Sequence, residues 1–310
     1  MDYIMRVCPK CKKELPVPAN LTECICMYCG EPFRIREQAA GKEEVEEVGE
    51  IEIAYQEALE QMSALVEDYE ALLQKFTKEW YQTCFLEYAR LGATILSPIN
   101  RYAALSQELR SKALDATSEK LMDALERNIK ADQGILIKKS KAILIDQNRY
   151  FLAVYLVPML QYLQLELGDA LTDRIMEDWT KRYPKSAFKK ATYEELEAGF
   201  MRKGFCFITS AVCDSQNKPD NCYELERFRG YRDQFLMSNE EGRKLVEEYY
   251  NRAPRIVTYL NMQVDCEERY QRIWHQYLQP CLLDIEEGRM LQCQERYVRM
   301  VRDLNSQLPF

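Results

Sequence analysis

Apolar side chains recur with a helical period along most of the chain, and the clearest stripe lies between residues 53 and 85. Its members are spaced three or four positions apart: Tyr55, Leu59, Met62, Val66, Tyr69, Leu73, Phe76 and Trp80. Such spacing places them on one face of a long amphipathic helix. The stripe predicts packing against other helices of the same chain. A seam between two copies, and so a homo-oligomer through this helix, is the alternative.

Prolines predict where the next helices end or bend, because proline lacks a backbone donor and crowds the preceding turn. Pro98 is expected to break one helix, and a polar helix follows over about 101–130. The segment 149–179 is apolar almost all round at its start, which predicts the most buried helix of the middle region. Pro158 is expected to kink it, and Pro280 to break a later helix.

Two short motifs predict helix starts. Thr192 and Glu195 have the spacing of a capping box, in which the first side chain accepts from the third helical N–H and the second reaches back. Ser238 and Glu241 have the same spacing. We therefore expect one helix to begin after each threonine or serine.

Composition supports a mainly α-helical globular protein. The 310 residues are 47% hydrophobic and 30% charged, with only 11 glycines and with 20 tyrosines. The net charge of −8 argues against a dedicated nucleic-acid binder, which needs clustered basic residues. The single histidine, His275, leaves little room for a histidine-based catalytic triad.

The sequence also predicts a cytoplasmic protein without a membrane span. Its first residues lack the basic and apolar regions of a signal peptide. The longest apolar run, 151–160, is far shorter than the roughly 20 residues that cross a bilayer. Cysteines in such a compartment stay reduced and serve as ligands or packing residues.

Changes in composition divide the chain into five ranges. A cysteine-rich segment at 1–37 precedes an acidic linker at 38–53. A helical domain at 54–203, a helical hairpin at 204–262 and further helices at 263–310 complete the predicted organisation. The expected fold class is therefore mainly α, with a helical body and a small N-terminal β module.

Two Cys-x-x-Cys pairs mark the N-terminal segment. They are Cys8 with Cys11 and Cys26 with Cys29. Each pair can turn two thiolates toward one ion, and four such ligands make a tetrahedral structural Zn²⁺ site. Gly30 suits the left-handed turn that these knuckles need. The pattern resembles the zinc-ribbon family over about residues 6–36, which implies one structural zinc ion and folding coupled to its binding.

The fifth cysteine of this segment leaves one choice open. Cys24 either replaces Cys26 as a ligand or lies in a strand as a small packing residue. Zinc ribbons serve as nucleic-acid readers, as protein-docking modules and as structural plugs. This one carries several basic residues, which are Lys10, Lys12, Lys13, Arg34 and Arg36. Few aromatic side chains are interleaved with them, so docking to a protein is favoured over nucleic acid.

The range 204–262 carries a second pattern. Its groups, in order, are Phe205-Cys206-Phe207-Ile208, Glu226-Arg227-Phe228-Arg229, Gly242-Arg243, Tyr249-Tyr250 and Ala253-Pro254. They resemble the CFI-box C-terminal domain, a short module at the ends of many bacterial and archaeal proteins. The resemblance implies a module without an assigned activity. The chain departs from that pattern at Cys213-Asp214, where Tyr-Gly is common, and by adding Cys222.

Cys206 is the one candidate catalytic residue. Nearby arginines, if they converge on it, would lower its pKa and make a reactive thiolate. The alternatives are a buried thiol in a hairpin whose arginines pair with carboxylates, or a metal site that Cys206 shares with Cys213 and Cys222. The remaining single cysteines are expected to be packing residues: Cys84, Cys266, Cys281 and Cys293.

These patterns predict a non-enzymatic, zinc-binding cytoplasmic adaptor or scaffold that docks protein partners. One alternative is a thiol enzyme or redox sensor that uses Cys206. Another is nucleic-acid binding through the ribbon. Neither the partner, the oligomeric state nor any substrate follows from the sequence.

Overall fold

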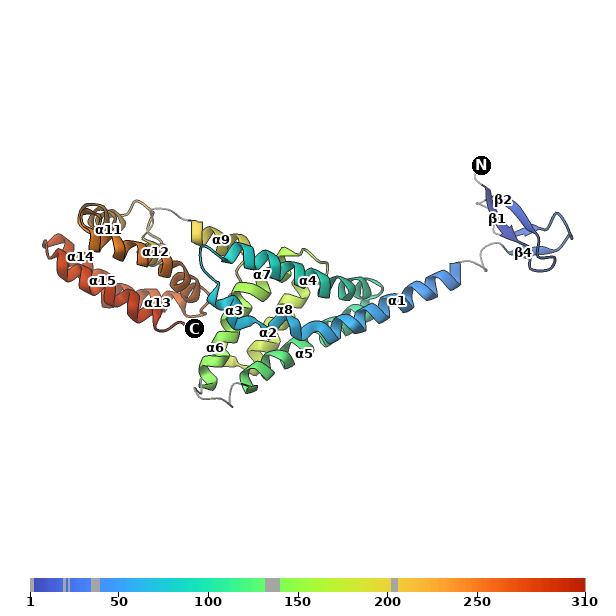
Figure 1. Ribbon diagram of the computed structural model, residues 1–310, viewed down its shortest axis with the longest axis horizontal. Coiled ribbons are helices and arrows are strands. Elements are labelled where there is room, and N and C mark those ends of the chain that lie inside the picture. Colours follow the sequence, from blue (N-terminus) through green and yellow to red (C-terminus); the bar gives the residue numbers. More distant parts are fainter. Residues whose placement is uncertain are drawn as a thin grey trace. The chain divides into compact units, whose positions relative to one another are not determined.

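The computed structural model describes residues 3–18, 21, 23–34, 40–131, 140–201 and 206–309 (Figure 1). Its contacts divide the chain into two compact units, 1–57 and 58–310. Helices make up most of the described chain, and the strands lie near the N-terminus, which confirms the predicted fold class. The finer division of the second unit into 54–203, 204–262 and 263–310 stays a prediction.

The first unit contains two antiparallel hairpins and most of a helix. Its elements are β1 (Tyr3–Val7), β2 (Glu14–Pro18), β3 (Glu23–Ile25), β4 (Pro32–Arg34) and α1 (Ala40–Glu60). β1 pairs with β2 in one two-stranded sheet, and β3 pairs with β4 in another. Alternate residues of β2 are buried, because side chains along a strand point to opposite faces. The acidic linker is helical from Ala40 onward.

The described residues of the second unit are mostly helical. The first group is η1 (Gln61–Ser63), α2 (Ala64–Glu67), α3 (Tyr69–Gln74), α4 (Tyr81–Ala104), α5 (Gln107–Ala131), α6 (Lys141–Phe151), η2 (Leu152–Leu156), α7 (Val157–Tyr162), α8 (Gly168–Arg182), η3 (Pro184–Ser186) and α9 (Tyr193–Met201). The second group is α10 (Phe207–Ser215), α11 (Tyr223–Gln234), η4 (Leu236–Ser238), α12 (Glu240–Asn261), α13 (Cys266–Ile273), η5 (Trp274–Leu278), α14 (Gln279–Glu286) and α15 (Met290–Asn305). No described helix is long and apolar enough to cross a membrane.

The single long helix expected over 53–85 is wrong. The chain there forms α1, η1, α2 and α3, turns after Gln74, and enters α4 at Tyr81. The stripe from Leu59 to Phe76 is nevertheless buried inside the chain, whereas Trp80 is 51% exposed. Several short helices can follow the curved surface of a core, whereas one straight helix would lose contact with it. No continuous seam for a second copy results, and a homo-oligomer stays a prediction.

The break expected at Pro98 is also wrong, because α4 runs through it from Tyr81 to Ala104. Ile95, Leu96 and Ile99 around the proline are all buried. Burial of each such side chain contributes about 1.5–3 kcal/mol, which together exceeds the cost of about 3 kcal/mol for an interior proline. Helix α12 passes through Pro254 in the same way.

Two other prolines follow π-helical segments. Pro158 comes two residues after η2, and Pro280 two residues after η5. The wider π turn changes the hydrogen-bond register just before the residue that has no N–H to donate. Pro280 therefore lies inside a continuous helical stretch and does not break it. The segment around η2 is the most buried part of the middle region, as predicted, since 150–160 is buried throughout.

One predicted cap is confirmed and the other is displaced by one residue. The Thr192 hydroxyl accepts from the Glu195 N–H at 3.2 Å, and the Glu195 carboxylate accepts from the Thr192 N–H at 2.9 Å. Helix α12, however, is capped by Asn239, whose side chain accepts from the Gly242 N–H at 2.8 Å. Asparagine is as good a cap as serine, so the neighbouring backbone conformation decides between them.

The C-terminal helices form a bundle around the Cys206 segment. Helix α10 contacts α11, α12 and α13, and α15 contacts α12 and α14. In Figure 1, α11 to α15 lie side by side in orange and red. Elements η4 and α12 contact each other, and α11 contacts η4, while the separate hairpin module over 204–262 stays a prediction.

Candidate metal centre

The turns of the two hairpins at the N-terminus are built alike. In the first turn, the Cys8 N–H donates to the Lys13 carbonyl at 2.9 Å, and the Lys12 N–H donates to the Cys8 carbonyl at 3.0 Å. These bonds leave the thiols of Cys8 and Cys11 on one side of the turn. The hairpin strands hold it in place, since Val7 pairs with Glu14 across its ends.

The second turn repeats this pattern at Cys26. The Cys26 N–H donates to the Glu31 carbonyl at 2.8 Å, and the Gly30 N–H donates to the Cys26 carbonyl at 2.8 Å. The fourth residue after the first cysteine has a positive φ in both turns, +74° at Gly30 and +60° at Lys12. The left-handed glycine was expected from the sequence. The left-handed lysine was not, although its position matches that of Gly30.

The four thiols come together in one cluster. All sulfur atoms of Cys8, Cys11, Cys26 and Cys29 lie within 4.8 Å of one another. The Cys8 and Cys29 sulfurs are 3.6 Å apart, as are those of Cys11 and Cys26. Four ligands at about 2.3 Å from a tetrahedral ion would be separated by about 3.8 Å. The geometry therefore fits one metal ion held by two thiolates from each hairpin.

Electrostatics within the cluster favour a cation. The Cys11 backbone N–H lowers the pKa of Cys8 to about 6. The Glu31 N–H also acts to lower the pKa of Cys29, but desolvation and the three neighbouring thiols outweigh it and raise that pKa to about 12. Several thiolates at this spacing repel one another. A divalent ion held by these four thiolates would remove that repulsion and favour loss of the remaining protons.

Cys24 lies outside the cluster. It is in β3 opposite Phe33, and both side chains pack against a small core of Cys8, Leu15, Val17 and Cys26. Desolvation by burial raises the pKa of Cys24, which disfavours the thiolate that a metal needs. Of the two alternatives for this cysteine, the structure shows the packing residue, and it places Cys26 in the cluster.

The surroundings of Cys206 do not activate its thiol. Cys206 is the N-cap residue of α10 and is buried. Burial raises its pKa to about 11, although Arg232 and Arg229 act in the opposite direction. Both arginines form ion pairs with carboxylates: Arg229 with Asp220 and Arg232 with Asp233, each at 2.7 Å. At neutral pH the thiol is protonated, and a protonated thiol is a poor nucleophile.

The other cysteines outside the cluster divide by environment. Cys213 lies beside Cys222, and burial together with that neighbour raises its pKa to about 12. Neither joins Cys206 in a metal-binding group among the described residues. Cys84, Cys281 and Cys293 are buried, in agreement with a packing role, whereas half-buried Cys266 accepts from the Lys189 ammonium at 2.9 Å.

His275 takes no part in either cysteine site. It is exposed within η5, and its Nδ1 is 3.1 Å from the Gln279 amide oxygen. This hydrogen-bonded helical position is the one expected for a histidine without a ligand role.

Comparison with known proteins identifies no relative of this chain. The chain matches no protein-family model, no curated protein and no solved structure. The resemblance to the CFI-box domain over 204–262 therefore stays a prediction that rests on the sequence pattern, and the zinc-ribbon assignment rests on the thiol geometry.

Proposed function

We propose that this chain is a zinc-binding, non-enzymatic adaptor of the cytoplasm, which docks a protein partner through its N-terminal ribbon. The four-cysteine cluster carries the proposal. Its donors are all thiolates in near-tetrahedral arrangement, and among common biological metals this set is typical of structural Zn²⁺. All twelve cysteines are described and none forms a disulfide, which suits a reducing compartment.

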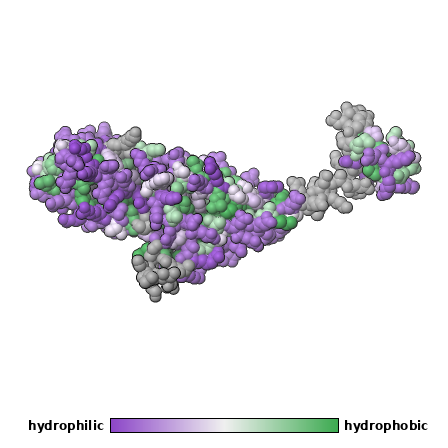
Figure 2. Space-filling view, viewed as in Figure 1, coloured by the Kyte–Doolittle hydropathy of each residue, from purple (hydrophilic) through white to green (hydrophobic). Residues whose placement is uncertain are grey.

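Exposed apolar side chains support docking by the ribbon. Around the second turn, Ile25 is 68% exposed, Met27 71% and Tyr28 53%. Met5 and Val7 of β1 are exposed as well. Figure 2 shows hydrophobic colour interspersed with hydrophilic residues on this module. Flexible methionine and amphipathic tyrosine side chains are enriched where proteins bind proteins.

The charges of the ribbon favour a protein partner over nucleic acid. Three of its cations already have partners within the ribbon: Lys10 pairs with Glu31 at 2.6 Å, Arg34 pairs with Glu23 at 2.9 Å, and Lys13 lies over the Tyr28 ring. Phosphate binding needs several cations free to replace counterions. The remaining positive charge suits a partner surface with apolar and acidic groups.

Metal analysis tests the zinc site. Purified protein should contain about one Zn²⁺ per chain. A variant carrying Cys8→Ser and Cys29→Ser should lose it, because two of the four ligands are gone. Cys24→Ser is the matched control, since it removes a thiol from the same module but not from the cluster. Full zinc content in the double variant, or equal loss in the control, would exclude this ligand set.

Affinity purification of the full chain from its native cell tests docking. We expect a protein that co-purifies with the wild type and is lost with Met27→Glu. Leu291→Glu changes an equally exposed apolar side chain on α15 and should retain it. The adaptor role is rejected if Met27→Glu recovers the same proteins as the wild type. Salt-dependent retention of DNA or RNA by the wild type would favour the nucleic-acid alternative.

A further inference from the structure

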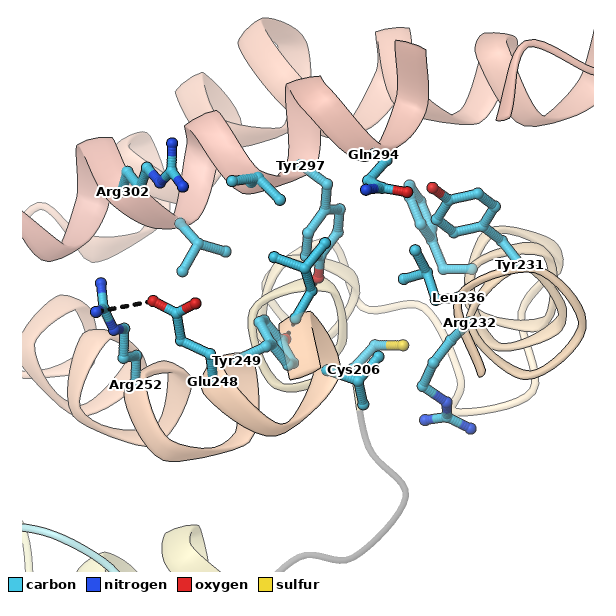
Figure 3. Close-up of a pocket in the computed structure, with 15 residues that line it drawn as sticks. Cys206, Tyr231, Arg232, Leu236, Glu248, Tyr249, Arg252, Gln294, Tyr297 and Arg302 are labelled. Atoms are coloured by element: carbon cyan, nitrogen blue, oxygen red, sulfur yellow. Dashed lines mark hydrogen bonds and ion pairs between the residues drawn. The ribbon is translucent and has the colours of Figure 1, made fainter. Parts of the chain in front are cut away.

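An apolar pocket lies among α11, α12 and α15, far in sequence from the cysteine cluster. Its volume is about 80 Å³, and Cys206 forms part of its wall. Figure 3 shows side chains from three helices directed into the space between them. The walls are mainly hydrocarbon and aromatic, with Phe228, Leu245, Val246, Val298 and Val301 among them.

The tyrosines of the pocket offer no free hydroxyl to its interior. Each hydroxyl is already hydrogen-bonded within the protein: Tyr231 to the Met290 carbonyl at 3.0 Å, Tyr249 to the Ile208 N–H at 2.9 Å, and Tyr297 to the Thr209 hydroxyl at 3.2 Å. The Cys206 thiol is a weak hydrogen-bonding group. Apart from the Gln294 amide, water would find few partners there, so an apolar group is the better occupant of the interior.

One end of the pocket is charged. Arg252 of α12 and Arg302 of α15 lie on facing helices at this end, and Glu248 of α12 turns its carboxylate toward Arg252 (Figure 3). Glu248 is paired with Arg252 at 2.8 Å. Arg302 is exposed and forms no ion pair with any described residue. These three side chains leave one net positive charge at this end.

The opposite end differs. Arg232 also lines the pocket, but its guanidinium turns away from the interior and is engaged by Asp233 and by the Tyr250 hydroxyl. The available cation is therefore at the Arg302 end alone. An apolar interior with one cationic end is complementary to a molecule with an apolar tail and one anionic group.

We propose that this pocket binds a small amphipathic carboxylate, with its tail among the α11, α12 and α15 side chains and its carboxylate at Arg302. At about 30 Å³ per water molecule in the liquid, a space of 80 Å³ corresponds to about three molecules, so the enclosed part of the tail is short and the rest lies along the pocket opening. The proposal is independent of the zinc site and of the adaptor role.

Calorimetric titration of the full, zinc-loaded chain tests the chemistry of the ligand. Octanoate should bind saturably, and acetate, which lacks the tail, should not bind at the same concentrations. Octan-1-ol, which lacks the charge, should bind several-fold more weakly than octanoate. The absence of saturable octanoate binding at millimolar concentrations, or equal affinity for the acid and the alcohol, overturns the proposal.

Variants test the location. Arg302→Gln should weaken octanoate binding roughly three- to tenfold, as expected for an exposed charge-assisted contact, and leave octan-1-ol binding unchanged. Arg299→Gln on the same helix does not line the pocket and should change neither. Val298→Phe should abolish both by filling the cavity. An unaffected affinity in Arg302→Gln contradicts the assigned end.

A measurement on the wild type covers the case in which Val298→Phe fails to fold. A photoreactive diazirine analogue of octanoate should label peptides from α11, α12 or α15, and excess octanoate should suppress that label. Labelling confined to other elements overturns the proposed site.

Discussion

The Tyr81 hydroxyl donates a hydrogen bond of 2.9 Å to the backbone carbonyl of Val154. Val154 lies four residues before Pro158, so it is the carbonyl to which an α-helix would direct the N–H that proline lacks. A side chain from α4 thus supplies the missing donor to η2. Both residues are buried, and water cannot easily replace the bond.

We expect Tyr81→Phe to lower the free energy of unfolding by about 1–2 kcal/mol, because a buried carbonyl loses its donor while the ring and its packing remain. Urea unfolding should show a lower midpoint with an unchanged slope. Tyr162→Phe is the control, since Tyr162 is exposed and its change should stay within about 0.5 kcal/mol. Equal stability of the two variants would show that this hydrogen bond makes no net contribution to the free energy of unfolding.

The left-handed residues of the two cysteine turns give opposite predictions. Lys12→Gly removes the cost of about 1–2 kcal/mol that a side chain has at positive φ, and should tighten zinc binding. Gly30→Ala introduces that cost and should weaken binding. A Cβ at Gly30 would meet nothing within 4 Å, so the effect there is conformational.

Folding of the ribbon and zinc binding are coupled, so competition with a chromophoric chelator measures both variants. A change of 1 kcal/mol corresponds to about fivefold in affinity. Lys13→Gly is a suitable control because Lys13 has no positive φ. Effects of the same sign in Lys12→Gly and Gly30→Ala would contradict the explanation.

Gly242 at the start of α12 is expected to resist substitution. A Cβ there would lie 2.0 Å from the Leu236 carbonyl oxygen. Relieving this clash requires a shift of the η4 backbone, which costs free energy. Gly242→Ala should therefore destabilise the protein by more than about 2 kcal/mol. Gly230→Ala in α11 meets nothing within 4 Å and should stabilise it by up to about 1 kcal/mol. Thermal unfolding of both variants distinguishes these outcomes.

Asp178 of α8 should make stability depend on pH. Burial acts against ionisation, but hydrogen bonds from the Ser118 hydroxyl and the Arg174 guanidinium outweigh it and hold the pKa of Asp178 below its ordinary value. The unfolded-state pKa is about 3.9, so this stabilisation is complete well above pH 4 and is lost as the pH falls through the folded-state pKa.

Asp178→Asn should accordingly lower the free energy of unfolding by about 1 kcal/mol at pH 7, and the difference should shrink below about pH 4. Glu177→Gln, at an exposed position of the same helix, should have little effect at either pH. A deficit in Asp178→Asn that persists at low pH would assign its cause to packing.

A structural feature of this protein can be predicted from the sequence when the residues that form it lie close together in the chain. The capping box at Thr192 is formed by atoms three residues apart, and the prediction is confirmed. The helix through Pro98 was mispredicted, because burial of Ile95 and Ile99 by distant segments overrides the local preference of proline. The positive φ of Lys12 was missed, although the equivalent Gly30 was a usable signal.

The sequence by itself determined the mainly helical class and the four candidate metal ligands, because helical periodicity and Cys-x-x-Cys turns are set by residues a few positions apart. Only the tertiary structure decided between Cys24 and Cys26, buried Cys206 so that desolvation outweighs the effect of Arg232 and Arg229 on its pKa, and enclosed an apolar pocket beside Arg302. Each of these features depends on burial by helices or strands that are distant in the sequence. Such burial cannot be read from the residues next to the site.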